Sequence, residues 1–193
     1  MDLMLPFGLA LDFETGVLQP CNNLTQRRIS DMIGMYADQE ATEKAIKEGN
    51  PLVYEVYQYD VPFEEGQLLV VTTIIHPGKV GEEYYMTKGH FHQKEYTAEV
   101  YVGLKGEGYL LLESRKGDFR ALEMKSGTVA YVPPYWAHRT VNVGSEKFVF
   151  FGVYPADAGH NYKEIEKRGF AQILVERDGK PVLVPNPNRF KQS

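Results

Sequence analysis

The sequence predicts an all-β protein made of short antiparallel strands, and three observations lead to this fold class. Most of the central part of the chain consists of segments rich in Val, Ile, Tyr, Phe and Thr, which are enriched in strands. Gly, Pro or charged residues separate these segments at short intervals, as tight turns do. Helical patterns occur only near the two ends of the chain. An antiparallel barrel or sandwich is therefore expected, and not a βαβ sheet.

The first expected element is a helix over residues 39–48. Asp38 can cap its N-terminus, acidic residues lie near its start and Lys residues near its end, and Gly49 provides a C-terminal stop. Towards the other end of the chain, residues 161–167 form a second short helical pattern that Gly169 would end. Residues 185–193 are expected to be an extended tail.

Seven strands are expected between the two helices. They have the branched and aromatic composition described above, and several alternate in character along their length. The linkers 105–107 and 142–145 have the composition of hairpin turns. The expected strands span residues 52–59, 67–75, 98–104, 108–113, 128–132, 139–143 and 147–154.

The composition of the chain excludes several classes of protein. Of its 193 residues 43% are hydrophobic, and 13 Tyr and 10 Phe need burial, which excludes intrinsic disorder. This length fits one domain with a sizeable core, and no change of composition marks a second one. The 21 Lys and Arg against 26 Asp and Glu give a net charge of −5, which argues against a nucleic-acid surface. Small-molecule chemistry is the expectation that remains.

The cellular setting follows from two further features. The longest apolar stretch near the start, residues 3–11, contains Pro6 and Gly8 and is too short to span a membrane. No basic residue precedes it, so it is also a poor signal peptide. Cys21 is the single cysteine and has no partner for an internal disulfide, which favours a reducing, cytoplasmic location.

The five histidines contain the clearest chemical signal. His90 and His92 flank one residue, and on a strand the side chains of residues i and i+2 point to the same side. Glu99 opens a later strand, and His138 follows a loop stiffened by two prolines. Three imidazoles and a carboxylate suit Fe, Mn, Ni or Zn. A His-x-His pair alone is more often a polar strand face, and Glu95 is an alternative carboxylate ligand.

The spacing around these residues resembles the two signature motifs of the cupin superfamily. Glu99 is followed after six residues by Gly106, and the later segment has Gly-x5-Pro before His138 and Asn142. The resemblance implies a cupin barrel, also called a double-stranded β-helix or jelly roll, with a few short helices. The sequence departs from the pattern in its longer gap between His92 and Glu99, in the absence of a Gly five residues before His90, and in Tyr135, which stands where the second motif has Gly.

A narrower resemblance extends over nearly the whole chain. The sequence is similar to the archaeal cupin-type glucose-6-phosphate isomerases in residues 6–8, 12–16, 87–92, 98–102, 131–142 and 154–160. The resemblance implies a homodimeric enzyme that interconverts glucose 6-phosphate and fructose 6-phosphate. It further implies one divalent metal per subunit, Fe²⁺ in the first place, with Mn²⁺, Ni²⁺ and Zn²⁺ as alternatives. The expected organisation is a single domain over residues 1–193, with an N-terminal extension of roughly 1–50 and a metal-binding core over 67–155.

The same resemblance assigns site residues. The metal ligands are expected to be His90, His92, Glu99 and His138, and the catalytic residues Glu99, His138, Tyr154 and His160. The phosphate is expected at Thr73, Thr87, Gly89 and Tyr154, and the sugar at Tyr101, Tyr135 and His160. Without the resemblance, the threonines read equally well as ordinary strand residues, the tyrosines as barrel packing and His160 as a solvated loop residue.

The chemistry leaves alternatives open. Four protein ligands on an octahedral ion leave two adjacent positions, which the C1 and C2 oxygens of a sugar can occupy. Glu99 is the candidate base for moving a proton between these carbons, but coordination lowers its basicity, so a hydride shift is a second route. A cupin dioxygenase and a non-catalytic sugar-binding cupin are the competing functions. A dioxygenase can use the same ligand set, whereas a binding protein has no need of it.

Overall fold

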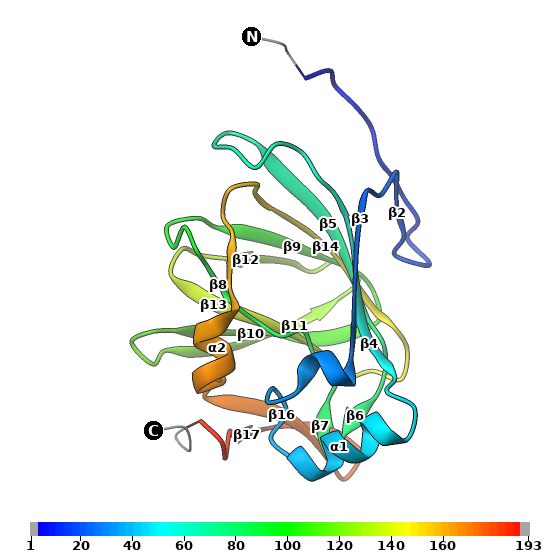
Figure 1. Cartoon of the computed structure of the whole chain (residues 1–193), viewed down its shortest axis with the longest axis vertical. Helices are drawn as coiled ribbons and strands as arrows, with labels where there is room; N and C mark the ends of the chain where they lie inside the picture. Colours follow the sequence, from blue (N-terminus) through cyan, green and yellow to red (C-terminus); the bar gives the residue numbers. More distant parts are fainter. Residues whose placement is uncertain (1–3, 190–193) are drawn as a thin grey trace.

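The computed structural model describes residues 4–189, and its strands form an open β-barrel (Figure 1). Three short helices lie outside the barrel: the 3-10 helix η1 (Ile29–Met32), α1 (Gln39–Lys47) and α2 (Tyr162–Arg168). The strands are β1 (Ala10–Leu11), β2 (Leu18–Gln19), β3 (Asn23–Arg28), β4 (Leu52–Tyr59), β5 (Leu68–Ile75), β6 (Lys79–Val80), β7 (Glu83–Tyr84), β8 (Phe91–His92), β9 (Glu99–Lys105), β10 (Glu107–Ser114), β11 (Phe119–Lys125), β12 (Val129–Val132), β13 (Trp136–Asn142), β14 (Phe148–Pro155), β15 (His160–Asn161), β16 (Gln172–Arg177) and β17 (Lys180–Pro185).

Two antiparallel sheets make the walls of the barrel. One has the strand order β12-β9-β14-β5-β4-β3 and the other the order β11-β10-β13. Strands distant in sequence are neighbours, since β14 pairs with both β5 and β9. Leu110 and Leu112 of β10 and Phe148 and Phe150 of β14 belong to one buried hydrophobic cluster. This arrangement confirms the all-β fold class and the cupin barrel.

The expected elements are confirmed with shifts of a few residues at their ends. α1 begins after Asp38, whose side chain accepts a hydrogen bond from the Ala41 N–H at 2.9 Å, and α2 ends at Gly169. The seven expected strands correspond to β4, β5, β9, β10, β12, β13 and β14, of which β13 begins three residues earlier than expected. No helix within residues 4–189 has the length and apolar character that crossing a membrane would require.

Several strands are absent from the sequence-based expectation, and the longest of them are β3, β11, β16 and β17. The inward side chains of β3 are polar, so it lacks the apolar alternation of a half-buried strand. Most side chains of β11 and β17 are exposed at sheet edges, where the composition is weakly constrained. β17 pairs with β16 along its whole length. The prediction that an extended tail begins at residue 185 is therefore wrong for this residue, which is the last of a paired strand.

The rest of the expected tail is bound to the body of the protein as far as the structure describes it. Asn186 donates to the Phe170 carbonyl at 3.0 Å, and Asn188 donates to the Ala37 carbonyl at 2.8 Å. The Arg189 N–H closes a turn on the Asn186 carbonyl at 3.3 Å. These bonds replace an extended tail with an ordered turn. Residues 190–193 lie outside the described residues.

Tyr135 explains one departure from the second cupin motif. It has a φ of 71°, in the left-handed region that favours glycine, and 59% of its surface is exposed. The N–H of Tyr135 donates to the Glu95 carbonyl at 2.7 Å, which holds the turn. The backbone therefore keeps the conformation for which the motif uses Gly, although a side chain is present.

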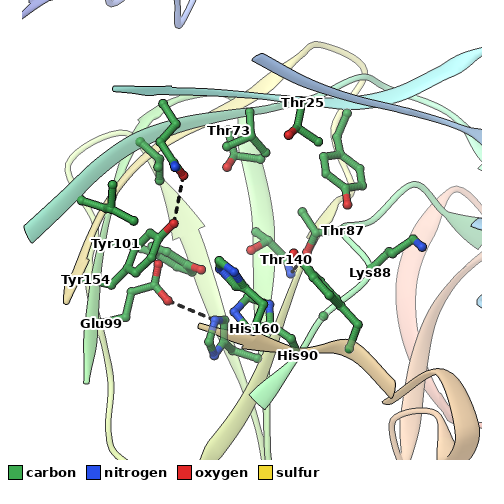
Figure 2. A pocket seen from close by; sticks show the side chains of 18 of the residues that line it. Thr25, Thr73, Thr87, Lys88, His90, Glu99, Tyr101, Thr140, Tyr154 and His160 are labelled. Carbon is green, nitrogen blue, oxygen red and sulfur yellow. Dashed lines mark hydrogen bonds and ion pairs between the residues drawn. The ribbon is translucent and has the colours of Figure 1, made fainter. Parts of the chain in front are cut away.

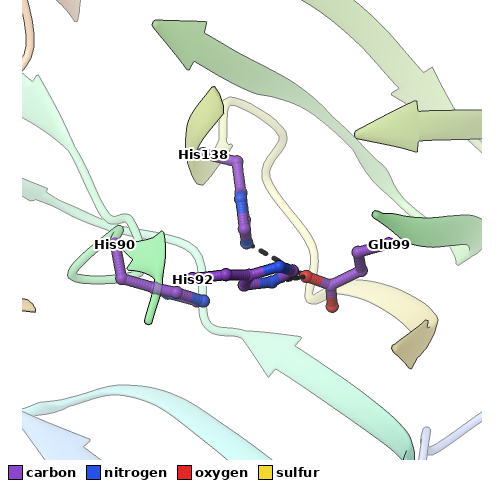
Figure 3. A group of neighbouring side chains, drawn as sticks. All are labelled: His90, His92, Glu99 and His138. Atoms are coloured by element: carbon purple, nitrogen blue, oxygen red, sulfur yellow. Dashed lines mark hydrogen bonds and ion pairs between the residues drawn. The ribbon is translucent and has the colours of Figure 1, made fainter. Parts of the chain in front are cut away.

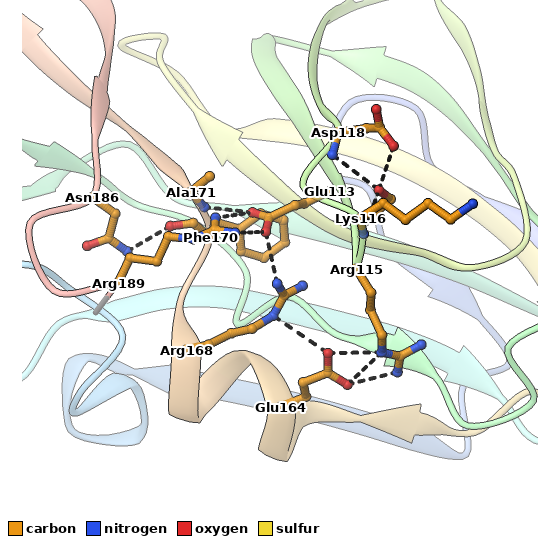
Figure 4. Close-up of polar contacts among 11 residues, drawn as sticks. Glu113, Arg115, Lys116, Asp118, Glu164, Arg168, Phe170, Ala171, Asn186 and Arg189 are labelled. Atoms are coloured by element: carbon orange, nitrogen blue, oxygen red, sulfur yellow. Dashed lines mark hydrogen bonds and ion pairs between the residues drawn. The ribbon is translucent and has the colours of Figure 1, made fainter. Parts of the chain in front are cut away.

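A buried carboxylate fastens α2 to the barrel (Figure 4). Glu113 of β10 has no exposed surface, and it accepts hydrogen bonds from Arg168 at 3.0 Å and from the Ala171 N–H at 2.6 Å. Arg189 also bonds Glu113, at 2.9 and 2.6 Å. One carboxylate thus joins a barrel strand, the end of α2 and the segment after β17.

A second set of contacts connects the same helix to the metal-ligand segment. Arg115 binds both carboxylate oxygens of Glu164, on α2, with distances of 2.8 to 3.1 Å. The guanidinium carbons of Arg115 and Arg168 lie 4.1 and 5.3 Å from the centre of the Phe91 ring. Because Phe91 separates His90 from His92, this packing holds the His-x-His segment against α2.

Replacing Glu113 tests this network. We expect Glu113→Ala to lower the free energy of unfolding by about 3–5 kcal/mol, because the Arg168 guanidinium loses its buried carboxylate partner. Equilibrium urea denaturation measures the change. Glu65→Ala, at an exposed loop carboxylate, is the control and should change stability by less than about 0.5 kcal/mol. Equal stability of the two variants would contradict the assigned role of Glu113.

Candidate active site

Four of the sequence-predicted residues form one buried group (Figure 3). The ligand atoms of His90, His92, Glu99 and His138 all lie within 4.8 Å of one another. Glu99 Oε2 is 3.2 Å from His92 Nε2 and 3.1 Å from His138 Nε2. Ligands about 2.0–2.2 Å from one cation are separated from each other by about 3 to 4.4 Å. The group therefore needs only a small contraction to hold a metal ion.

Backbone pairing places these side chains. The His90 N–H donates to the His138 carbonyl at 3.2 Å, and the His138 N–H donates to the His90 carbonyl at 3.0 Å. His92 ends β8 and Glu99 begins β9, so both flank the same connection. The alternative carboxylate, Glu95, instead forms an ion pair with Arg115 at 3.0 Å and lies outside the group.

The hydrogen bonds of His92 identify which of its nitrogens faces the group. His92 Nδ1 lies 3.2 Å from the Thr97 carbonyl oxygen and 2.8 Å from its hydroxyl. Because a carbonyl can only accept, Nδ1 carries a proton. The Nε2 lone pair is then directed at Glu99, unless a second proton or a cation lies between them. This is the arrangement in which an outer hydrogen bond orients a metal-binding imidazole.

The other two imidazoles leave buried nitrogens without protein partners. Within residues 4–189, His90 Nε2 and both ring nitrogens of His138 are buried and form no hydrogen bond that meets the usual geometric limits. Burial, followed by the neighbouring His138, His160 and His92, lowers the pKa of His90 well below its usual range. A neutral imidazole has a free lone pair. These unpartnered nitrogens beside a carboxylate fit one divalent cation.

Glu99 is ionised in this environment. Burial favours its neutral form, but the imidazoles of His138 and His92, whose Nε2 atoms lie 3.1 and 3.2 Å from Glu99 Oε2, outweigh burial and lower its pKa to about 2. The group therefore offers one negative charge among imidazole nitrogens. A cation placed there would be partly neutralised by protein ligands alone.

The group opens into a cavity of about 350 Å³ (Figure 2), at the lower end of the range for small-molecule sites. Six of the seven residues expected to contact the phosphate or the sugar lie on its wall. Thr25 and Thr73 lie on the opposite side of the cavity from Glu99 and His90. The expected residues on the wall are Thr73, Thr87, Gly89, Tyr101, Tyr154 and His160, and Tyr135 is not among the lining residues.

Hydrogen bonding gives Tyr154 a defined direction. Its hydroxyl donates to Gln58 Oε1 at 3.0 Å, and the Gln58 amide nitrogen in turn donates to Asp60. With its proton used in this way, the Tyr154 hydroxyl presents lone pairs to the cavity. Burial, followed by the charge of Glu99, raises the pKa of Tyr154 well above its usual range, so the hydroxyl stays protonated.

His160 is a neutral wall residue. Its ring centre lies 4.3 Å from that of His90, and it stacks against Tyr162 at 5.6 Å. Burial, opposed by the charge of Glu99, lowers the pKa of His160 to about 4. His160 is paired with His92 across β15 and β8, so it is not the solvated loop residue that its sequence context allows.

Several wall residues are absent from the sequence-based set. Two are cations, Arg27 and Lys88, and the others include Asn23, Thr25, Tyr54, Gln58, Thr140 and Tyr162. Asn23, Thr25 and Arg27 are the inward residues of β3, and a two-residue period of polar side chains is the only signal that marks them. Lys88 lies directly between Thr87 and Gly89, so its position in the sequence did point to the site.

The fold and the buried His/His/Glu/His group define a cupin with a polar internal cavity. The chain belongs to the glucose-6-phosphate isomerase (GPI) family, whose sequence model matches residues 26–190. It is 52% identical over 182 residues to a glucose-6-phosphate isomerase of Thermococcus litoralis, covering 94% of this chain and 95% of the relative.

Two further relatives bear the same name. The protein of Pyrococcus furiosus is 50% identical, with 97% of this chain and 98% of the relative covered. The protein of Thermococcus kodakarensis is 49% identical over the full length of both chains. Among solved structures, an oxalate decarboxylase from Bacillus subtilis matches with a TM-score of 0.46 and 24% identity, over 56% of this chain and 26% of the decarboxylase.

The Thr97 hydroxyl provides a test of metal binding that leaves every ligand in place. We expect Thr97→Val to weaken binding of Zn²⁺ about tenfold, since the variant keeps the carbonyl but loses the hydroxyl that orients His92. Competition with a chromophoric chelator measures the affinity. Thr128→Val, in a turn after β11, is the matched control and should bind Zn²⁺ normally. Unchanged affinity in Thr97→Val would show that another contact orients His92.

Proposed function

We propose that this chain catalyses the interconversion of D-glucose 6-phosphate and D-fructose 6-phosphate, and that the reaction depends on a divalent metal. The observation that carries the proposal is a single cavity that combines the His/His/Glu/His group with a wall of hydroxyls and two cations. The three relatives described above bear the name of this activity.

The proposed metal ligands are His90, His92, Glu99 and His138. Imidazole and carboxylate ligands without a thiolate favour Fe²⁺, Mn²⁺, Ni²⁺ or Zn²⁺, of which we propose Fe²⁺ as the native ion, one per subunit. When bound, the ion would polarise the C1 and C2 oxygens of the sugar. The chain itself supplies the orientation of the ligands, through Thr97 and the backbone pairing of His90 with His138.

The proposed phosphate contacts are Thr73, Thr87 and Gly89 on the cavity wall. Their hydroxyl and backbone N–H groups suit a dianion, and Arg27 and Lys88 on the same cavity wall add positive charge. Tyr154 was expected among these contacts as well. Because its proton is donated to Gln58, we propose that it accepts a hydrogen bond from a sugar hydroxyl instead. Such remote binding would hold C1 and C2 beside Glu99.

The proton transfer has two candidate routes. In the first, Glu99 removes a proton from C2 and returns it to C1, while His138, Tyr154 and His160 hold the sugar in place. In the second, hydrogen passes directly between the two carbons as hydride. The neighbouring imidazoles lower the pKa of Glu99 and so make it a weaker base, which favours the second route.

The proposal also covers the domain organisation, oligomeric state, location and partners of the protein. We propose one cupin domain over residues 1–193, with an N-terminal extension of roughly 1–50 and the metal-binding core over 67–155. We also propose a homodimer in the cytoplasm that serves glycolysis and gluconeogenesis. The phosphosugar is the proposed partner molecule, with no nucleic acid or membrane partner.

Metal removal tests the function directly. We expect EDTA to abolish conversion of fructose 6-phosphate, and Fe²⁺, Mn²⁺, Ni²⁺ or Zn²⁺ to restore it to different extents. Elemental analysis should find no ion in His138→Ala but one per chain in His76→Ala, because His76 pairs with Glu55 outside the metal group. Full turnover of metal-free protein would refute the metal dependence. Oxygen uptake by the Fe²⁺ form without isomerisation would identify a dioxygenase instead.

Glu99→Gln separates the two proton-transfer routes. If Glu99 is the base, the metal-loaded variant should lose about 10²–10⁴ in kcat, and the wild type should exchange the C2 hydrogen with D₂O during turnover. NMR of the product measures this exchange. Near-normal turnover of the variant, with C2 deuterium delivered wholly to C1, would establish hydride transfer and leave Glu99 as a ligand only.

A further inference from the structure

Arg139 is a fully buried cation with an unusual set of partners. It follows His138 on β13, and only 2% of its surface is exposed. Its Nε and Nη2 both donate to the Lys88 carbonyl, at 3.2 and 2.7 Å. Within residues 4–189 it forms no ion pair with a carboxylate at 4.0 Å or less. Burying a guanidinium whose hydrogen-bond acceptor is a neutral carbonyl costs free energy of folding. This cost indicates that the contact has a role beyond packing.

The contact fixes the orientation of the next peptide group. In a trans peptide the C=O and N–H point in opposite directions, so a Lys88 carbonyl turned towards Arg139 directs the Gly89 N–H away from it. The flanking N–H groups are already used, because Thr87 donates to the Thr140 carbonyl at 2.9 Å and His90 to the His138 carbonyl. The Gly89 N–H has no acceptor among residues 4–189, and Gly89 lies on the cavity wall.

The packing around Gly89 leaves no room for a side chain at this position. Gly89 has a φ of 76°, and a Cβ there would lie 2.8 Å from the Phe170 ring and 3.0 Å from Arg139 Cβ. The guanidinium of Arg139 in turn lies 4.7 Å from the centre of the Phe170 ring. Arg139, Phe170 and the Gly89 backbone are therefore packed as one unit behind the cavity wall.

The neighbouring hydroxyl completes a pair of donors. Thr87 Oγ1 accepts the Thr140 N–H at 3.1 Å, so its own proton is free to donate to a ligand. The Gly89 N–H and the Thr87 hydroxyl thus flank Lys88, whose ammonium pairs only loosely with Glu166 at 3.5 Å. Two donors and a cation within three consecutive residues are suited to an anionic oxygen cluster.

We propose that Arg139 is a positioning residue for substrate phosphate: it turns the Gly89 N–H into the cavity and places a buried positive charge behind that donor. The proposal rests on the proposed function, because it takes the phosphate of the sugar as the group bound at Thr87 and Gly89. Arg139 itself touches no substrate. Arg139 holds the Lys88–Gly89 peptide group in one orientation, with the Gly89 N–H directed into the cavity. The peptide group therefore needs no rotation when the anion binds.

The first test uses Arg139→Met, which keeps an unbranched apolar stem but removes the donors and the charge. We expect KM for fructose 6-phosphate and the inhibition constant of inorganic phosphate to rise together by about 10- to 100-fold, with kcat within about threefold of wild type. Metal content should stay at one ion per chain. Arg139→Lys, which retains the charge and a donor, should recover part of the loss.

Arg168→Met is the matched control, since Arg168 also stacks on a phenylalanine and bonds a buried acceptor but does not reach Lys88. It should lower stability without changing the inhibition constant of phosphate. A merely structural role for Arg139 predicts the same result for Arg139→Met: lost stability or metal, and an unaltered inhibition constant. That outcome would overturn the proposal.

A second measurement needs no variant. In the Zn²⁺-loaded wild type, titration with inorganic phosphate should move the Gly89 amide proton downfield by NMR, and by more than the amides of Thr87 and His90. An unmoved Gly89 amide at saturating phosphate would refute the inference. Phosphate bound at Gly89 in a protein without isomerase activity would refute the proposed function while the inference stands, so the two failures are distinguishable.

Discussion

The backbone pairing of His90 with His138 is the constraint on which the rest of the site depends. Reciprocal hydrogen bonds of 3.2 and 3.0 Å join a short connection to β13 and bring two imidazoles to one point. The same pairing sets Arg139 and Thr140 beside Lys88 and Thr87. Consequently His90 and His138 of the proposed metal end, and Thr87 and Gly89 of the proposed phosphate end, lie on one paired stretch of backbone. Their separation is set by this backbone pairing, which side-chain motion cannot alter.

Burial fixes the protonation state of the cavity wall. It lowers the pKa of His90 and His160 and raises the pKa of Tyr101 and Tyr154, so these two imidazoles stay neutral and these two phenols stay protonated near neutral pH. Glu99 is the exception, because the neighbouring imidazoles of His92 and His138 outweigh the effect of burial on its pKa. The wall thus offers fixed donors and acceptors around one carboxylate. A site of this kind needs little reorganisation when charge shifts on a bound sugar.

The parts of the molecule that sequence analysis predicted are those with a local pattern. The His-x-His pair fits a strand period, Glu99 and His138 stand at spacings that resemble the two cupin motifs, and the central strands have a clear composition. β3 was missed because its inward face lines a polar cavity and therefore lacks apolar alternation. Arg27 was missed with it. The proposed role of Arg139 could not be predicted for another reason. The role depends on the hydrogen bond from Arg139 to the Lys88 carbonyl, and no sequence pattern indicates such a contact.

The carboxylate of Glu113 has a consequence for the order of events during synthesis. Its partners Arg168 and Arg189 follow it by 55 and 76 residues. A nascent chain whose β10 has already left the ribosome therefore carries Glu113 without either guanidinium. Water must solvate that carboxylate until α2 and the segment after β17 emerge. The contacts of Glu113 with Arg168 and Arg189, and the packing of Arg168 on Phe91, can therefore form only after the last part of the chain has been synthesised.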